Sequence, residues 1–254
     1  MPLRLLPLEL QDFDELISHA ASYPPGQDLV GLPTPLCCKV TTQEEALARL
    51  TFHFAKQRTR FTSDPTVRYM KVVDTDGPSD TSIVSIARWH FYPRGYSFAS
   101  EAHWELQDAA VPGGQPVPKG FDVGLHNHIL TTRDAARPSW IKADAPCWIL
   151  MHMVTHPAHR GKGAAGLLVK WGIEQAEKDG VPAYLEAGVM GRPIYERYGF
   201  VQVGELLEVD LSAFGIEGNL SEFGMGVVIV MWTMAYFPKS MTGREEEIKI
   251  AIES

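Results

Sequence analysis

Residues 156–166 read His-Pro-Ala-His-Arg-Gly-Lys-Gly-Ala-Ala-Gly, and they separate a predicted strand from a predicted helix. The segment before them, 147–154, is almost entirely apolar and predicts a largely buried strand. Apolar residues after them recur at helical spacing from Ala164 to Trp171 and predict an amphipathic helix. The glycines of the quoted stretch therefore fall on a turn between a strand and a helix.

This turn has the features of a site for phosphate oxygens. Gly161 and Gly163 let the backbone approach a ligand closely, because glycine has no Cβ. The first turn of the helix leaves backbone N–H groups unpaired at the positive end of the helix dipole. Both properties favour an anion at this position.

The charges near the turn fit an anionic ligand. The whole chain has a formal net charge of −8 at pH 7. No acidic residue occurs between Asp144 and Glu174, whereas Arg160, Lys162 and Lys170 all lie there. An anion would meet a local positive field at the turn. The alternative is an ordinary glycine turn followed by a solvated basic start of a helix.

Two common nucleotide-binding motifs do not fit this stretch. The phosphate loop Gly-x-x-x-x-Gly-Lys-Ser/Thr is absent, and Gly163 is followed by Ala164. The letters Gly-x-Gly-x-x-Gly of the dinucleotide fingerprint occur at residues 161–166, and Glu186 is the only acidic residue at the required distance on a following strand. The segment before these letters, however, does not fit the first βαβ unit that the fingerprint requires.

The turn and two later segments resemble one known family. Arg160–Ala165 is similar to the acetyl-CoA signature Arg/Gln-x-x-Gly-x-Gly/Ala of the GNAT superfamily of N-acetyltransferases. Gly180–Ala187 and Pro193–Phe200 continue the resemblance in the family's order and spacing. Together the segments cover about residues 147–210 and look most like the little-characterised GNAT group common in filamentous fungi.

The resemblance implies an α/β GNAT fold. We expect a mixed, mostly antiparallel central sheet of about seven strands, with helices on both faces and with the fourth and fifth strands splayed apart. Sequence patterns predict strands near residues 3–6, 67–74, 82–92, 147–154, 181–187, 201–211 and 226–236. They predict helices near residues 10–21, 42–54, 125–136, 164–179 and 191–198.

We expect a single domain over residues 1–237, with an insertion at about 93–146 and a charged tail at 238–254. The Pro/Gly-rich stretch Val111–Pro118 excludes regular helix or strand there. We expect the insertion to fold partly over the mouth of the substrate site; the alternative is a mobile loop without a ligand role.

Composition excludes several other classes of protein. Hydrophobic residues make up 45% of the chain and no apolar run reaches the length of a membrane span, so we expect no membrane partner. The early proline and acidic residues argue against a signal peptide and favour a cytoplasmic protein. We expect a monomer or a homodimer. Its three cysteines suit reduced thiols, its nine histidines show no metal-ligand spacing, and its basic residues leave no footprint for nucleic acid.

The family resemblance implies where acetyl-CoA binds as cosubstrate. The pantetheine arm would pair with the backbone of Met153 and Thr155, on either side of Val154, as an added strand would. The backbone amides that follow would hold the pyrophosphate, with the charge of the first side chain adding to them. These residues are Arg160, Gly161, Lys162, Gly163, Ala164 and Ala165.

The resemblance also implies direct transfer, in which a neutral amine attacks the thioester carbonyl while both substrates are bound. Tyr195 would then donate a proton to the departing thiolate, whereas Tyr198 is expected to face inward. Tyr195 could instead only pack against the cofactor arm.

The base is less apparent. Histone-type relatives carry a Glu at the position of Cys147, and many relatives carry a polar residue at Gly188. Candidate bases, in addition to a water molecule, are His152, Glu186, His126 and His128.

The sequence therefore predicts an acetyl-CoA-dependent N-acetyltransferase that acts on a small amine or an amino-acid-like metabolite. The alternative is a catalytically decayed acyl-CoA-binding or sensing protein of the same fold, which Cys147 and Gly188 would favour. O-acetylation and transfer of a longer acyl group stay open as variants of the first prediction.

Overall fold

The structure is a computed structural model and describes residues 3–76, 83–97, 116–216, 227–241 and 243. The chain divides into two compact units. The first unit comprises residues 1–89, 106–126 and 152–168; the second comprises residues 90–105, 127–151 and 169–254. Two strands and two helices contribute residues to both units.

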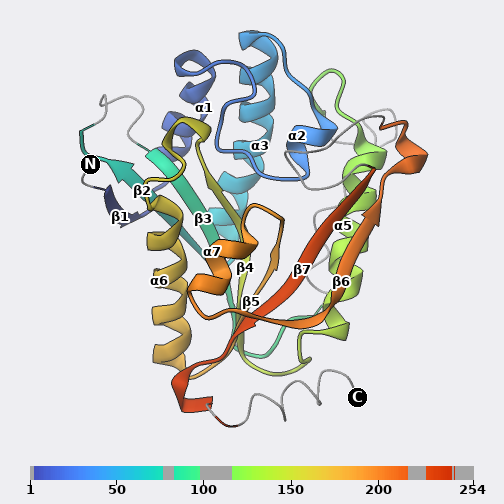
Figure 1. The fold of residues 1–254 in the computed structure, drawn as a ribbon. Helices are drawn as coiled ribbons and strands as arrows, with labels where there is room; N and C mark the ends of the chain where they lie inside the picture. The colour runs from blue at the N-terminus through green and yellow to red at the C-terminus, as the bar shows by residue number, and fades with distance from the viewer. Residues whose placement is uncertain (1–2, 77–82, 98–115, 217–226, 242, 244–254) are drawn as a thin grey trace. The chain divides into compact units, whose positions relative to one another are not determined.

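The strands of the described residues form a seven-stranded sheet with the order β1-β2-β3-β4-β5-β7-β6 (Figure 1). Strands β4 and β5 are parallel, whereas β1 with β2, β5 with β7, and β6 with β7 are antiparallel. The strands are β1 (Leu3–Pro7), β2 (Val67–Asp74), β3 (Ile83–Tyr92), β4 (Cys147–Thr155), β5 (Ala183–Ala187), β6 (Val201–Asp210) and β7 (Val228–Tyr236).

The α-helices of the described residues are α1 (Asp12–Ser22), α2 (Thr34–Cys37), α3 (Gln43–Ser63), α5 (Val123–Ala136), α6 (Ala164–Asp179) and α7 (Arg192–Arg197). Short 3₁₀ turns follow α5, β4, β6 and β7. Among the described residues, no helix is both long and apolar enough to cross a membrane.

In the first unit, α1 and α3 pack together over an apolar core. Phe13 of α1 contacts the ring of Phe54 of α3 and stands edge-on to Tyr69 of β2. Helix α3 begins with a capping box, in which the Thr42 side chain accepts from the amide of Glu45 while the Glu45 carboxylate accepts from the amide of Thr42. This cap explains why the predicted helix starts here.

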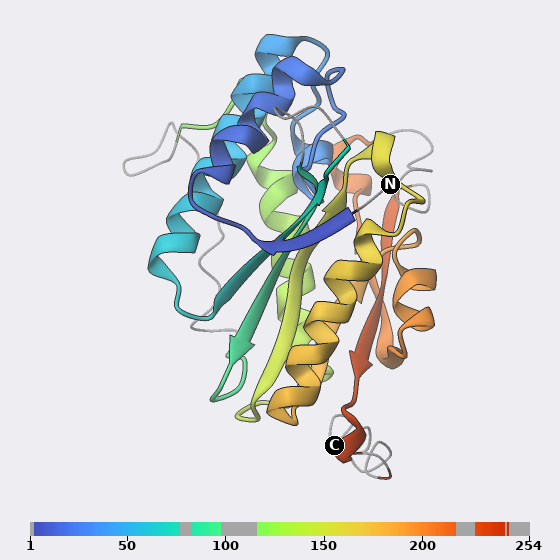
Figure 2. The same cartoon turned by 90° about the vertical axis from the view of Figure 1, so that its left-hand side faces the viewer.

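In the second unit, neighbouring residues of β4 face different helical segments. The Trp148 indole donates to Asp179 of α6 at 2.9 Å, and its ring stands edge-on to Trp171 of the same helix. Ile149, by contrast, packs in a cluster with Trp140, which follows α5. Because side chains alternate across a strand, helical segments cover both faces of the sheet here, as Figure 2 allows the reader to follow.

The predicted elements agree closely with the observed ones. The strand predicted at 67–74 is β2 over the same residues, and the helix predicted at 125–136 is α5. The helix predicted to begin at residue 42 continues to Ser63, further than its apolar spacing indicated. Most of the Val111–Pro118 stretch, and residues 242 and 244–254 of the tail, lie outside the described residues.

Candidate active site

Strand β4 changes its surroundings halfway along. Its parallel register with β5 pairs Trp148–Leu150 with Ala183–Leu185, whereas β4 itself continues to Thr155. Residues 147–150 are buried and residues 151–155 are half-buried. The pairing with β5 therefore stops before β4 does, as the predicted splaying of the fourth and fifth strands requires.

The end of β4 is bonded to β3 through alternate peptide groups. The Val154 carbonyl accepts from the Ser85 hydroxyl at 2.9 Å, and the His156 amide donates to the Val84 carbonyl at 2.9 Å. Since successive peptide groups of a strand point to opposite edges, those of Met153 and Thr155 are directed away from β3. They have the orientation that pairing with a pantetheine arm needs, and the Val154 carbonyl between them is occupied.

The turn after β4 needs glycine at two positions. Gly161 has φ +77° and Gly163 has φ +93°, in the region that residues with a side chain rarely adopt. A Cβ built on either residue would have no atom within 4 Å. The space beside both glycines is therefore open, which is what close approach of a ligand to this backbone requires.

Backbone donors are concentrated at this turn. Within the described residues, none of the backbone amides from Gly161 to Gly166 donates to a backbone carbonyl. Helix α6 begins at Ala164, so the last three of these amides belong to its unpaired first turn. The Arg160 amide is different, because it donates to the Pro157 carbonyl at 3.3 Å. The Arg160 amide is therefore already paired here, and its part in holding the pyrophosphate stays a prediction.

Two exposed basic side chains lie on the same turn. Arg160 and Lys162 are both exposed, and the Arg160 Nε donates to the Thr155 carbonyl at 3.4 Å. Open space, free amides and positive charge together fit the pyrophosphate of a coenzyme A thioester. The part that each residue plays in binding stays a prediction.

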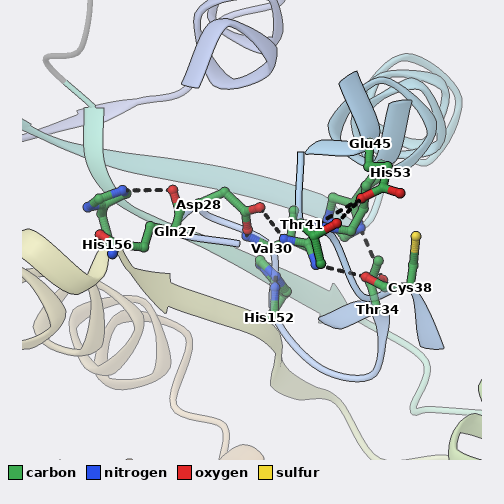
Figure 3. A network of polar contacts seen from close by, with 12 residues as sticks. Gln27, Asp28, Val30, Thr34, Cys38, Thr41, Glu45, His53, His152 and His156 are labelled. Atoms are coloured by element: carbon green, nitrogen blue, oxygen red, sulfur yellow. Dashed lines mark hydrogen bonds and ion pairs between the residues drawn. The ribbon is translucent and has the colours of Figure 1, made fainter. Parts of the chain in front are cut away.

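Two histidines attach a distant loop to this part of β4, a contact that no sequence pattern predicted. His156 is fully buried; its Nδ1 accepts from the Ala158 amide at 3.2 Å and its Nε2 bonds the Gln27 carbonyl at 3.0 Å (Figure 3). One ring nitrogen accepts and the other donates, so the ring is neutral. Burial lowers the pKa of His156, in agreement with this bonding.

His152 holds the other end of the same loop. Its Nε2 accepts from the Gly31 amide at 3.1 Å. A Cβ at residue 31 would lie 2.8 Å from that nitrogen, so only glycine fits beside the ring. Between the two contacts, Asp28 forms a buried ion pair with Arg49 at 2.5 Å and accepts from the Val30 amide at 3.0 Å. Residues 27–31, which we name the β4 strap, are therefore fixed rather than loosely connected.

In the second unit, Tyr195 lies on α7 with only 6% of its surface exposed. Its ring stands edge-on to Phe200, and a Cβ at Gly191 would lie 2.9 Å from it. Its hydroxyl has no hydrogen-bond partner among the described residues, and burial raises its pKa. Tyr195 is therefore protonated at neutral pH and can donate a proton.

Tyr198 is less buried than Tyr195, although it was expected to face inward. It is only half-buried, and the Lys170 ammonium lies 5.8 Å from the centre of its ring. The spacing of Tyr195 and Tyr198 along the short helix α7 places one ring in the core and leaves the other at the surface.

Neither Cys147, which occupies the position of the Glu in histone-type relatives, nor the candidate base Glu186 is free to act as a base. Cys147 is buried, and burial raises the pKa of its thiol to about 12, so it is neutral. Glu186 forms a two-fold ion pair with the buried Arg137, at 2.6 and 3.0 Å. A carboxylate held in this way is occupied and does not serve as a free base.

The histidine candidates differ from one another. The His128 Nε2 bonds the Asp210 carbonyl at 2.8 Å, so that nitrogen is the donor. His126 is buried with its ring beside Phe121. His152 is half-buried, and its Nε2 already accepts from the β4 strap. Among the described residues, no three His, Cys, Asp or Glu side chains gather in a way that could hold a metal ion.

Comparison with known proteins identifies the domain that carries this turn. Residues 140–214 match the family model described as acetyltransferase (GNAT) domain. This part of the chain is therefore similar to a GNAT acetyltransferase domain. The matched range includes β4, the turn with Gly161 and Gly163, and α7 with Tyr195.

Several solved structures are similar in fold to nearly the whole chain. Arylalkylamine N-acetyltransferase 2 from Aedes aegypti is 14% identical with a TM-score of 0.54, over 93% of this chain and 99% of that chain. An acetyltransferase from Corynebacterium glutamicum related to histone acetyltransferase HPA2 is 18% identical with a TM-score of 0.45, over 94% of this chain and 97% of that chain. Arabidopsis thaliana NAA60 in complex with acetyl-CoA is 11% identical, TM-score 0.46, over 93% and 99%.

These findings confirm two predictions. The fold is the GNAT fold, a mixed seven-stranded sheet with helices and a parallel β4–β5 pair. The enzyme class is that of the GNAT N-acetyltransferases, a family that uses acetyl-CoA. At this level of identity the solved structures show the fold alone, so the acceptor has to be argued from the chain itself.

Proposed function

We propose that this GNAT protein transfers the acetyl group of acetyl-CoA directly to the nitrogen of a small amine or an amino-acid-like metabolite. The observation that carries the proposal is the turn at Gly161–Gly166. It combines unused backbone amides, the start of α6 and open space beside two glycines of positive φ. The name of the Aedes aegypti protein, an arylalkylamine N-acetyltransferase, is in keeping with a small amine acceptor.

The residues of this chain divide the work as follows. Amides from Gly161 to Ala165 hold the pyrophosphate, and the outward peptide groups of Met153 and Thr155 hold the extended arm. When the amine nitrogen attacks the thioester carbonyl, a C–N bond forms and the C–S bond breaks. Tyr195, which is protonated at neutral pH, gives its proton to the sulfur that leaves; burial raises its pKa and so makes it a weak acid.

We propose that water removes the proton from the ammonium group of the acceptor. Cys147 is a neutral buried thiol and Glu186 is held by Arg137, so neither residue is suited to act as the base. An amine that has lost its proton to water before it binds needs no protein base. Because the neutral fraction of the amine increases with pH, the rate should rise with pH.

A second candidate function is an acyl-CoA-binding or sensing protein whose catalytic centre has decayed. The buried Cys147, at the position where histone-type relatives carry a Glu, is the observation that favours it. Such a protein would bind acetyl-CoA at the same turn and release no CoA.

An assay of CoA release over a panel of amines separates the two candidates. The transferase predicts acetyl-CoA-dependent release that needs an amine and yields the N-acetylated product by mass spectrometry. Tight binding of acetyl-CoA without release, over amines and alcohols alike, would favour the sensor.

We further propose a cytoplasmic monomer or homodimer, and a single domain with its insertion. The finer resemblance to the filamentous-fungal group stays a prediction.

A further inference from the structure

Positive charges surround one histidine of the first unit. His53 of α3 is half-buried, with its ring centre 5.8 Å from that of His152 of β4. Burial lowers the pKa of His53 well below its usual value, and the charges of His152, Arg88, Arg49 and Lys56 lower it further. These cations come from α3 and from β3, the neighbour of β4 in the sheet.

Only one of the three permanent cations is compensated within the described residues. Arg49 pairs with Asp28 of the β4 strap and donates to the Cys38 carbonyl at 2.9 Å. Arg88 donates instead to the neutral amide oxygen of Gln57 at 2.5 Å, and its buried Nε has no acceptor among the residues that the structure describes. It forms no ion pair with any carboxylate that the structure describes.

Lys56 is the second uncompensated cation. It is half-buried, its ammonium lies 5.4 Å from the centre of the Phe52 ring, and it has no ion pair with a described carboxylate. Burial, followed by the charge of Arg60, lowers its pKa to about 8. The lowered pKa of Lys56 indicates that its surroundings stabilise the charged ammonium less well than water does.

Two half-buried cations are costly here, because each loses hydration and neither gains a carboxylate partner within the described residues. The Tyr69 hydroxyl donates to the same Gln57 amide oxygen at 2.6 Å, which fixes the amide that orients Arg88. The guanidinium is thus held in place with a donor left over. A bound carboxylate would supply what both cations lack.

The position of this cluster relates it to acetyl transfer. His152, which contacts the ring of His53, directly precedes Met153, whose peptide group is turned away from β3 towards the expected acyl arm. We propose that Arg88 and Lys56 form an anion subsite that binds the carboxylate of the acceptor, which makes amino acids, rather than amines without a carboxylate, the preferred substrates. The inference rests on the proposed function and selects one of its two substrate classes.

The subsite predicts a specific pattern of acceptor preference. Matched pairs that differ only in the carboxylate are phenylalanine and 2-phenylethylamine, histidine and histamine, and lysine and cadaverine. In CoA-release assays the amino acid of at least one pair should exceed its decarboxylated partner in kcat/KM by about 10-fold or more, since a hydrogen bond to a charged group is worth about that factor. Equal or better use of the decarboxylated amine in every pair overturns the subsite.

Variants locate the effect. Arg88→Gln and Lys56→Met should each raise KM for the preferred amino acid by about 10- to 100-fold and change kcat, and the KM for acetyl-CoA, by less than about 3-fold. Arg88→Lys keeps the charge and should recover part of the loss. Arg68→Gln removes a positive charge from an exposed position of the same unit and is the control. If the KM for acetyl-CoA rises instead, the cations serve the cosubstrate and the inference is wrong.

A binding measurement separates the two possible failures. Calorimetric titration of each folded variant with the amino acids, in the presence of CoA, reports affinity without turnover. If the unmutated protein binds an amino acid and both variants lose this binding, but no CoA is released from acetyl-CoA, then the subsite is supported and the proposed transferase is overturned. Turnover of amines with constants that neither variant changes keeps the transferase and overturns the subsite.

Discussion

Single residues of this protein show two different reasons for glycine. Gly161 and Gly163 have positive φ and open space around the missing Cβ, so the backbone conformation and the approach of a ligand both ask for glycine. Gly31 and Gly191 have ordinary φ but lie against the rings of His152 and Tyr195, so packing excludes a side chain. The first pair concerns binding and the second concerns the shape of the protein.

Gly163→Glu should abolish binding of acetyl-CoA, because a carboxylate would occupy the open space and repel the pyrophosphate. We expect a loss of at least about 100-fold by calorimetry, with the circular dichroism spectrum unchanged. Gly120→Glu is the matched control, since Gly120 also has positive φ, at +76°, and open space, in the same unit. Equal loss in both variants, or in neither, would place the binding site elsewhere.

Tyr195→Phe should lower kcat by about 10²-fold and leave the affinity for acetyl-CoA unchanged, because it removes a proton donor and keeps the ring. The factor is modest because a thiol has a pKa of about 8.5, so that its thiolate can leave without help. Tyr198→Phe is the control at a half-exposed ring and should keep full turnover. Full turnover in Tyr195→Phe would return that residue to a packing role.

At the scale of elements, the β4 strap is the feature that organises the end of β4. It is bonded by His152 at Gly31, by His156 at Gln27, and by Arg49 of α3 at Asp28 (Figure 3). These contacts join a loop before α2 to the strand that leads into the cofactor turn. A loop with so many fixed groups behaves as part of the sheet and not as a mobile connection.

Gly31→Ala should destabilise the protein by about 1–3 kcal/mol, because the new Cβ displaces the His152 ring and leaves the residue 31 amide without its acceptor. Urea unfolding at neutral pH measures the change. Gly188→Ala, at a glycine of ordinary φ with no atom within 4 Å of its Cβ, should change the free energy of unfolding by less than about 0.5 kcal/mol. A neutral Gly31→Ala would mean that the strap contact is dispensable.

At the scale of the whole molecule, stability should depend on pH through buried histidines. His19 of α1 is 1% exposed, neither of its ring nitrogens has a hydrogen-bond partner among the described residues, and burial lowers its pKa to about 4. The charges of His156 and His159 act in the same direction. Protonation of this region is therefore unfavourable in the folded state.

The sign of the pH effect follows from the lowered pKa. The stabilisation from neutral His19 is fully present above pH 6.5, the value of an unperturbed histidine, and is lost as pH falls to about 4, because the unfolded chain takes up the proton first. The free energy of unfolding of His19→Leu relative to that of the unmutated protein should therefore rise by about 3 kcal/mol from pH 7 to pH 4. Urea unfolding across this range measures it; a difference that does not vary with pH would contradict the buried neutral state.

The chain's local patterns were sufficient for most of the fold and for the cofactor turn. Strand and helix periodicity predicted β2, β4 and α6, and the glycines at 161 and 163 with the following helix predicted an anion site, because these properties depend on residues that are neighbours in sequence. Local patterns did not anticipate the partial exposure of Tyr198 or the hydrogen bond of the Arg160 amide, because both depend on how a short helix and a 3₁₀ turn are packed.

Only the tertiary structure decided which side chains meet. Gly31 and His152 are 121 residues apart, Glu186 lies 49 residues from the Arg137 that occupies it, and Arg88 meets Gln57 across 31 residues. No periodicity encodes such pairs, since each one arises when the sheet brings distant strands and helices into contact. The sequence therefore determined the elements and the turn that suits a phosphate, whereas packing decided which histidines are neutral, which carboxylate is occupied and which cations are left without a partner.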